Sequence, residues 1–281
     1  MQPGQRRLEG PQARHLVRVL RIRAGEQITV FDGTGFEADA IVKAVEGADV
    51  ELAIGELRAA RSEPATAVVL ATAVPKGERF DWLVEKGTEL GVARLIPLIT
   101  ERSVVVPGTA KLERLQKKVI EASKQCGRSK LMEISPATPW AAFVERELAS
   151  HGGCVAHPGG EPLAGPPRLH FSPLPPGEGS GVSEHDVRPP PSLPAPLPGG
   201  GGSTAPAAAA GINPAACQDQ TMRRSEAFIG AIGPEGGFSD GELGMAVAAG
   251  AKLVSLGPRV LRIETAALVL AALLSDVTGG Q

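Results

Sequence analysis

The chain has 281 residues, 42% of them hydrophobic, which is enough for about two domains with buried cores. Its formal net charge of −2 argues against a protein that coats nucleic acid by bulk charge, although it permits local basic patches. Three scattered cysteines without a CxxC pair argue against a disulfide framework or a structural zinc site and favour a reducing compartment.

Targeting and membrane segments are not evident. The N-terminus lacks the apolar core of a signal peptide, and the longest apolar run, 266–274, is too short to cross a bilayer. The spacing of His15, His151 and His157 is not that of a metal site. We therefore expect a soluble, cytoplasmic protein that needs neither a membrane nor a metal.

Residues 1–65 are predicted to form one small β-barrel domain. In 27–54, short β-prone runs alternate with Asp-Gly, Gly-Thr-Gly and Glu-Gly turn signals. A helix is expected before them, with apolar and basic residues on different faces: Leu16, Val19 and Leu20 against Arg14, Arg18 and Arg21. The segment 61–66 is predicted to be a linker, because Pro64 disfavours helical geometry at Glu63.

Residues 66–281 are predicted to form an α/β domain with a mostly parallel sheet, because strand and helix patterns alternate. Strands are expected at 67–74, 92–99, 153–158, 227–233 and 252–257. Helices are expected at 77–91, 110–127 and 239–250, with Gly91 and Gly127 as stops. Ser239 and Glu242 have the spacing of a capping box at the start of the third helix.

The stretch from about 159 to 221 interrupts this order. It is rich in Pro and Gly and has no apolar periodicity, so it cannot bury enough surface to offset its ordering entropy. We interpret it as a disordered insertion into a loop, which is tolerable because the cost of closing a loop grows slowly with its length. A proline-rich docking motif is the alternative.

A glycine-rich loop in IGPEGGFSDGE, residues 232–242, runs from a predicted strand into a helix. This geometry is typical of an anion or cofactor cradle, but neither the dinucleotide fingerprint nor a Walker lysine is present. Glu235 would repel a pyrophosphate, so a ligand without phosphates fits better. The alternative is a tight turn that needs Gly236 and Gly237 for positive φ.

A second loop, LGPRVLRIETA at 256–266, contains Arg259 and Arg262 just before an apolar helix. Thr265 as the N-cap and Glu264 near the positive helix end would explain the start of that helix. Two arginines are disfavoured there, so they indicate an anionic partner such as a phosphate or carboxylate. The helix has no polar face until Ser275, which predicts burial in the core or in a dimer interface.

Basic residues also gather in two stretches outside these loops. Both are typical of solvated helix faces, but their concentration in a negatively charged chain favours phosphate contacts. The first comprises Arg6, Arg7, Arg14, His15, Arg18, Arg21 and Arg23, and the second comprises Lys111, Arg114, Lys117, Lys118, Lys124, Arg128 and Lys130.

The motifs together resemble those of the bacterial 16S rRNA uracil-N3 methyltransferases of the SPOUT superfamily. They are RHLVRVLR, KGERFDWLVEKGTELGV, ITERSVV, EASKQCGR, IGPEGGFSDGE and SLGPRVLRIETAAL. The resemblance covers nearly the whole chain except the Pro/Gly-rich stretch. It implies a PUA-like β-barrel that helps to bind RNA, followed by a SPOUT-type α/β domain with a trefoil knot, whereas the residues alone predict an ordinary doubly wound sheet. It also implies a homodimer.

The activity implied by this resemblance is methylation of N3 of a specific uridine in 16S rRNA, free or in the small subunit, with S-adenosyl-L-methionine as cofactor. The cofactor-binding residues implied are His157, Ile232, Gly233, Pro234, Glu235, Gly236, Gly237, Leu256, Gly257, Arg259, Leu261, Arg262 and Thr265. The expected RNA-binding residues are Arg14, His15, Arg18, Arg21, Lys76, Lys86, Arg102 and Arg128.

The reaction is an in-line methyl transfer that requires alignment of the two reactants and loss of the N3 proton. We expect Arg262 to orient the uridine or its phosphate and to favour the developing anionic base. We expect Arg259 to shape the loop or contact RNA. Glu264 and Glu235 are weaker candidates for handling the proton, because a lone carboxylate at a helix start is more often structural.

Three other functions are compatible with parts of the sequence. A SPOUT methyltransferase for tRNA or for a ribose hydroxyl would have similar knot loops, although the N-terminal motif favours the uracil-N3 family. A non-catalytic RNA-binding or ribosome-assembly factor would lack cofactor binding. A nucleotide-phosphate enzyme is disfavoured by Glu235 and by the missing Walker lysine.

Overall fold

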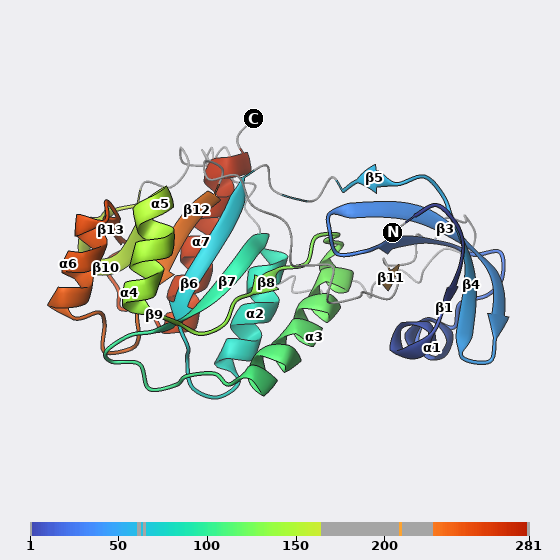
Figure 1. The fold of residues 1–281 in the computed structure, drawn as a ribbon, viewed down its shortest axis with the longest axis horizontal. Helices are drawn as coiled ribbons and strands as arrows, with labels where there is room; N and C mark the ends of the chain where they lie inside the picture. Colours follow the sequence, from blue (N-terminus) through green and yellow to red (C-terminus); the bar gives the residue numbers. More distant parts are fainter. Residues whose placement is uncertain (1, 61–62, 64–65, 164–207, 210–226, 280–281) are drawn as a thin grey trace, which may run out of the picture.

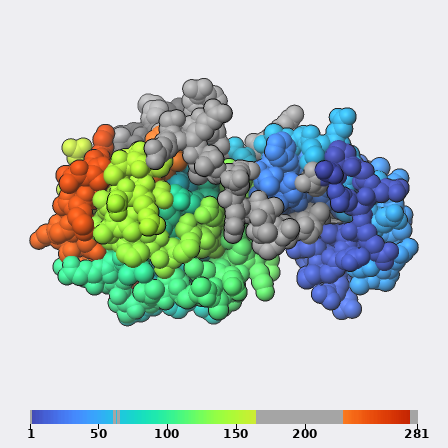
Figure 2. Space-filling view, in the orientation of Figure 1, coloured from blue at the N-terminus to red at the C-terminus, as the bar shows by residue number. Residues whose placement is uncertain are grey.

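The computed structural model describes residues 2–60, 63, 66–163, 208–209 and 227–279, and these fall on two separate sheets. We call residues 2–60 the N-terminal domain and residues 66–163 with 227–279 the C-terminal domain. Figure 1 shows the two domains side by side along the long axis of the molecule, with helix α3 of the C-terminal domain nearest to the N-terminal domain. Figure 2 shows them as a blue lobe and a green-to-orange lobe.

The strands β1 to β5 of the N-terminal domain pair in antiparallel fashion, in the order β1-β4-β3-β2, with β5 also on β3. The two-residue β11 pairs with β2 in parallel. The strands are β1 (Gly4–Leu8), β2 (Gln27–Phe31), β3 (Phe36–Glu46), β4 (Asp49–Ile54), β5 (Arg58–Ala59) and β11 (Ala208–Ala209). Alternate residues of β3 and β4 are buried, as expected for a sheet with one face on a core.

Helix α1 (Gly10–Arg18) packs on this core through Ala13 and Leu16, which confirms a helix with one apolar face. The predicted helix was too long, however. The helix ends at Arg18 with Val19 as its C-cap, Val19 is 65% exposed, and Arg21 has a φ of 52° in the following turn. Val19 therefore lies outside the core, and Arg21 does not share a helical face with Arg14 and Arg18.

The C-terminal domain has a seven-stranded sheet in which all pairs are parallel. The strand order is β13-β10-β12-β6-β7-β8, with β9 also on β7. The strands are β6 (Ala67–Ala73), β7 (Val92–Ile99), β8 (Glu133–Ile134), β9 (Thr138–Pro139), β10 (Cys154–Pro162), β12 (Ala227–Ile232) and β13 (Lys252–Ser255). The predicted α/β class and parallel sheet are thus confirmed.

Helices cover both faces of this sheet, which explains the continuous apolar runs of its strands (Figure 1). Val68 and Leu70 of β6 face a core formed with α2 (Arg79–Glu89), α3 (Thr109–Cys126) and α7 (Ile263–Gly279). Val69 and Ala71 face the opposite core, formed with α4 (Trp140–Phe143), the π-helix η1 (Val144–Leu148) and α6 (Asp240–Ala248). The short α5 (Ala149–His151) continues η1.

Glycines end two of the predicted helices as expected. Gly91 follows α2 with a φ of 83°, and Gly127 caps α3 in the left-handed conformation with a φ of 76°. Helix α7 departs from the prediction at its start. It begins at Ile263, and the carbonyl of Arg262 already accepts the Ala266 N–H at 2.8 Å. Thr265 therefore lies inside the first turn and is not the N-cap.

The capping box at α6 is confirmed, and it also joins two parts of the C-terminal domain. The Glu242 carboxylate accepts the Ser239 N–H at 2.9 Å and the Glu101 N–H at 2.8 Å, and the residue is 6% exposed.

We expect Glu242→Ala to lower the free energy of unfolding by about 2 kcal/mol, because both N–H groups lose a charged acceptor. Urea denaturation measures this change, with the exposed α6 residue Asp240→Ala as the control; an equal loss in both variants would contradict it.

Strand β10 continues to Pro162, so the predicted start of the insertion near 159 is too early. After Ala156 the strand makes an excursion and pairs again with β13 at Glu161, because Val254 is the register partner of both residues. Of the predicted insertion, residues 164–207 and 210–221 lie outside the described residues. No helix in the described part of the chain is long and apolar enough to cross a membrane.

Candidate cofactor site and RNA-facing surface

Four loops meet at the carboxyl edge of the parallel sheet, where ligands bind in open α/β folds. The pairing of Thr72 with Ile232, of Ile232 with Ala156 and of Ala156 with Val254 places the ends of β6, β12, β10 and β13 side by side. The loops that follow are 74–78, the excursion 157–160, the glycine-rich loop 233–239 and the arginine loop 256–262. The two loops singled out in the sequence are therefore close in space.

The glycine-rich loop is held in place by a backbone hydrogen bond and by aromatic packing. The Gly237 N–H donates to the Pro234 carbonyl at 2.8 Å, which closes a turn, and Gly237 has a φ of 71°. Phe238 is buried with its ring 4.4 Å from that of Trp140. A Cβ on Gly233 would come within 2.9 Å of the Phe238 ring, so glycine is required there. The loop is thus held with its backbone near the sheet edge.

Arg102 supports this loop from the segment after β7. Its Nη1 donates to the Gly236 carbonyl at 2.7 Å, and a Cβ on Gly236 would lie 3.3 Å from the Arg102 side chain. Arg102 was predicted to bind RNA, which stays a prediction because the residue is exposed; the contact with Gly236 gives it a role in holding the glycine-rich loop as well.

Arg79 at the start of α2 lies between Glu235 of the glycine-rich loop and Glu264 of α7, which directly follows the arginine loop. Its Nη1 is 3.8 Å from Glu235 Oε1, and its Nε is 3.7 Å from Glu264 Oε1. The Glu235 side chain is 60% exposed, whereas that of Glu264 is 11% exposed. Arg79 thus partly balances two carboxylates at an edge where a cationic ligand would be favoured. Sequence reasoning missed Arg79, because no local periodicity links it to loops so distant in the chain.

The arginine loop is the most exposed part of this edge. Arg259 and Arg262 are exposed, and Val260 is 96% exposed. Gly257 has a φ of 115° and open space where a Cβ would lie. Leu256 and Leu261 are partly buried against the core under the loop. The loop therefore presents two guanidinium groups to solvent while apolar residues anchor it.

The excursion of β10, residues 157–160, is the last of the four loops at this edge. His157 is half-buried, and its Nδ1 accepts the Gly159 N–H at 3.1 Å. Cys154, on the same strand, is buried, and burial raises the pKa of its thiol to about 11. A thiol with that pKa stays protonated near neutral pH and is not a nucleophile.

The residues fit S-adenosyl-L-methionine better than a nucleotide cofactor. The glycine-rich loop and Gly257 offer backbone at close range, which suits adenine and ribose. Glu235 and Glu264 lie at the same edge, which suits a sulfonium cation and not a pyrophosphate. Within the described residues, no group of three or more His, Cys, Asp or Glu side chains is arranged to hold a metal ion.

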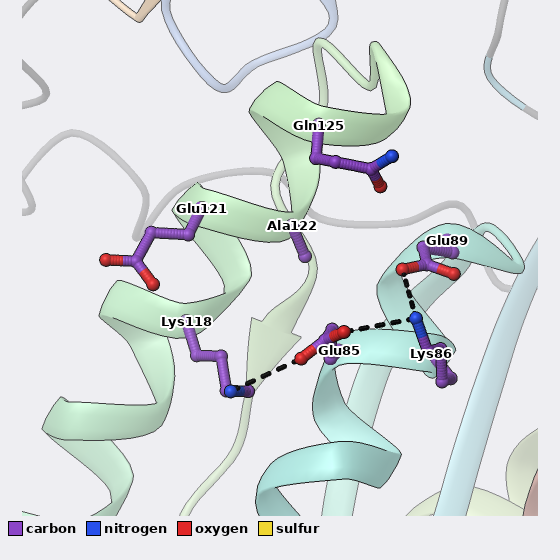
Figure 3. A pocket seen from close by; sticks show the side chains of 7 residues that line it. All are labelled: Glu85, Lys86, Glu89, Lys118, Glu121, Ala122 and Gln125. Atoms are coloured by element: carbon purple, nitrogen blue, oxygen red, sulfur yellow. Dashed lines mark hydrogen bonds and ion pairs between the residues drawn. The ribbon is translucent and has the colours of Figure 1, made fainter. Parts of the chain in front are cut away.

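The predicted RNA-binding residues differ in their exposure and in their partners. Arg14, His15 and Arg18 of α1, Arg21 and Lys76 are exposed. Lys86 lines a hollow of about 370 Å³ between α2 and α3, where it pairs with Glu89 and Glu85 at 2.8 and 3.1 Å (Figure 3). Hydrogen bonds to these two carboxylates raise the pKa of Lys86 above its usual value. An RNA contact at Lys86 would have to compete with both ion pairs.

Arg128 was predicted to bind RNA, and this prediction is wrong. The residue is 3% exposed, and its Nη1 donates to the carbonyls of Thr88 and Val92 at 3.0 and 2.9 Å. Its Nη2 donates to Glu63 Oε2 at 2.9 Å. The sequence places it in a basic stretch at the end of a helix, but the turn at Gly127 directs it into the protein.

Comparison with known proteins identifies both domains. The family described as "RNA methyltransferase domain" matches residues 61–165 and 207–275, and that described as "RNA methyltransferase PUA domain" matches residues 8–54. The segment 166–206, within the predicted insertion, is left unmatched.

Three relatives carry the same name, ribosomal RNA small subunit methyltransferase E. That of Synechocystis sp. is 31% identical over 93% of this chain and 69% of its own length. That of Bacillus subtilis is 25% identical over 96% of this chain and 90% of its own length. The crystal structure of the protein from Neisseria gonorrhoeae, bound to S-adenosyl methionine, has 25% identity and a TM-score of 0.70 over 99% of this chain and 94% of its own.

Proposed function

The chain belongs to the RNA methyltransferase family, and we propose that it methylates N3 of a specific uridine in 16S ribosomal RNA with S-adenosyl-L-methionine as donor. The observation that carries this function is the meeting of the glycine-rich and arginine loops at the carboxyl edge of the sheet. The N-terminal domain is PUA-like, which suits an RNA substrate.

The cofactor, when bound, supplies an electrophilic methyl group on sulfur. We assign its binding to the loop 232–237, to Leu256, Gly257, Arg259, Leu261, Arg262 and Thr265, and to His157. Among these, Thr265 is exposed on the first turn of α7, so its contact would be made at the rim. The knot implied by the family stays a prediction, as do the boundaries 1–65 and 66–281.

Arg262 is our candidate for the residue that acts on the uridine. It is exposed at the end of the arginine loop, where its guanidinium is free to approach a base or phosphate. As the N3 proton leaves, negative charge develops on the uracil ring and its carbonyl oxygens, and a fixed cation stabilises that charge. Arg259, three residues earlier, remains a candidate for shaping the loop or binding RNA.

Glu264 is our candidate for accepting the N3 proton, with Glu235 as the alternative. Glu264 is the more buried of the two and lies beside Arg79. A carboxylate at this edge is a group of the kind that acts as a general base towards a reacting N–H.

The proposed function can be tested by comparing ribosomal RNA from cells with and without the gene. We expect ribosomal RNA from cells lacking the gene to have lost 3-methyluridine, and expression of the wild-type chain to restore it. Mass spectrometry of the nucleosides measures both. Persistence of 3-methyluridine in the deleted strain would overturn the assignment of the base position, while failure of the purified protein to bind the cofactor would favour a non-catalytic ribosome-assembly factor.

RNA binding is assigned to the exposed basic residues of the N-terminal domain. We expect the Arg18→Glu/Arg21→Glu variant to bind small-subunit RNA more weakly and to lower the slope of log Kd against log salt by about 2, because two phosphate contacts are lost. Filter binding at salt concentrations from about 50 to about 200 mM measures this slope. Lys252→Glu, exposed on β13, is the control; an unchanged slope in the double variant would exclude these residues.

A homodimer is supported by the outer face of α7. Ala267, Leu270 and Ala271 are fully buried, but the apolar residues Leu268, Val269, Ala272 and Leu273 are only partly covered. A partly exposed apolar helix face indicates a further packing partner. We propose that a second copy of the chain covers it, and a monomer at all concentrations in sedimentation would exclude this. We also propose that the protein acts in the cytoplasm, where it would meet its ribosomal RNA substrate.

A further inference from the structure

The segment 128–131, just after α3, joins the two domains through alternate residues. Arg128 and the backbone of Lys130 bond to Glu63, in the connector between the domains. Ser129 bonds to Glu37 of β3, and the backbones of Ser129 and Leu131 bond to the β2–β3 turn of the N-terminal domain. The segment therefore holds the connector on one side and the N-terminal domain on the other.

Arg128 and Glu63 form the buried half of this junction. Their side chains are 4% and 16% exposed, and the two guanidinium nitrogens Nε and Nη2 are 3.4 and 2.9 Å from the two Glu63 oxygens. Glu63 Oε1 also accepts the Lys130 N–H at 3.0 Å. Because Arg128 donates to the Thr88 and Val92 carbonyls as well, the connector is tied to the end of α2 and the start of β7.

The other half of the junction is made with the N-terminal domain. Ser129 Oγ donates to Glu37 Oε2 at 2.9 Å, and Arg58 donates to the other Glu37 oxygen at 3.0 Å. The Gly35 N–H donates to the Ser129 carbonyl at 3.1 Å, and the Leu131 N–H donates to the Gly33 carbonyl at 3.0 Å. These bonds fix the turn of the N-terminal sheet against the C-terminal domain, which a flexible linker alone would not do.

We propose that Arg128, Glu63 and Ser129 form an interdomain clamp that sets the distance between the RNA-binding surface of α1 and the cofactor edge. The inference rests on the proposed function, because it requires an RNA that contacts both domains. When two binding surfaces are held at a fixed spacing, the second contact forms at high effective concentration. Arg128 and Glu63 are thus positioning residues for RNA recognition, and they touch neither cofactor nor substrate.

The test compares truncation of two buried glutamates that each pair with an arginine. Glu63→Ala opens the clamp, and Glu147→Ala breaks the Arg94–Glu147 pair inside the C-terminal domain, where the Glu147 side chain is similarly buried at 17% exposed. Ser129→Ala is a milder variant that removes only the bond to Glu37. Cofactor Kd, methyl-transfer kinetics on small-subunit RNA, thermal midpoint and small-angle scattering are measured on the full chain.

We expect Glu63→Ala to raise the KM for RNA by about tenfold, because the two surfaces no longer bind as one unit. Its kcat should stay within about threefold and its cofactor Kd within about twofold of the wild type, because the cofactor loops are untouched. Ser129→Ala should raise the KM by a smaller factor. Glu147→Ala should lower the thermal midpoint without moving the KM. Scattering from Glu63→Ala should show a broader spread of interdomain distances.

Equal KM increases in Glu63→Ala and Glu147→Ala would overturn the clamp. A fall in kcat alone in Glu63→Ala would also overturn it. So would unchanged scattering together with an unchanged KM in both Glu63→Ala and Ser129→Ala. If the Glu63→Ala variant does not fold, Ser129→Ala decides by the same two readouts. Failure of the wild-type chain to methylate RNA would count against the proposed function, and scattering would still test the clamp.

Discussion

Replacing Arg262 with alanine is expected to lower the kcat of methyl transfer by about 100-fold or more, the range found when one group that stabilises a developing anion is removed. Arg262 lies at the exposed end of the arginine loop, directly before α7. Its side chain is not part of the core, so the variant should fold normally. The loss should therefore fall on turnover of RNA and not on stability.

The measurement is single-turnover methyl transfer to small-subunit RNA, with cofactor binding followed by calorimetry. Cofactor Kd should change by no more than about tenfold, because we expect backbone groups of the glycine-rich loop to supply most of the contacts. Arg146→Ala is the matched control, since Arg146 is an exposed arginine of η1 in the same domain. Full turnover in Arg262→Ala with normal cofactor binding would remove Arg262 from the catalytic residues.

Replacing Gly160 with alanine is expected to destabilise the C-terminal domain by about 3 kcal/mol and to abolish cofactor binding. A Cβ at Gly160 would lie 2.5 Å from the Val254 nitrogen and 2.6 Å from the Leu253 carbonyl carbon. These backbone atoms cannot move aside, because β13 pairs with β10 at Ala156 before the excursion and at Glu161 after it. The methyl group would force β10 away from β13 and displace the excursion that contains His157.

Gly159→Ala is the matched control for this prediction. A Cβ there would meet only ring atoms of His157 at 3.4 Å, and a side chain can turn away. Its free energy of unfolding should stay within about 1 kcal/mol of the wild type. Guanidinium denaturation and calorimetry with S-adenosyl-L-methionine measure both variants. Wild-type stability in Gly160→Ala would show that the excursion is more pliable than its pairing indicates.

Predictions made from local signals were accurate. The capping box of Ser239 and Glu242, the left-handed Gly127 and the buried run of β6 each depend on residues a few positions apart, where sequence spacing reports geometry directly. Helix ends without such signals were placed less well. Thr265 is a good N-cap residue, but α7 begins two residues earlier, because Arg262 already makes the first helical hydrogen bond.

Charge was the least reliable guide. Arg128 belongs to one of the two basic stretches, and Arg102 and Lys86 were also expected to bind RNA. In the structure the first is buried, the second donates to the Gly236 carbonyl and the third pairs with two glutamates. A cation in the sequence indicates a charge but not its partner. Partners such as Glu63 and Gly236 are distant in the chain, so only folding brings them into contact.

The sequence by itself determined the α/β class, the two domains, the glycine-rich and arginine loops and, through its motifs, the RNA methyltransferase family. These depend on local periodicity, turn residues and conformational demands that each segment carries alone. Only the tertiary structure decided that Arg79 lies between Glu235 and Glu264, that Gly160 must be glycine, and that Arg128 joins the domains. Each depends on strand register or on contacts between distant segments, which no local pattern encodes.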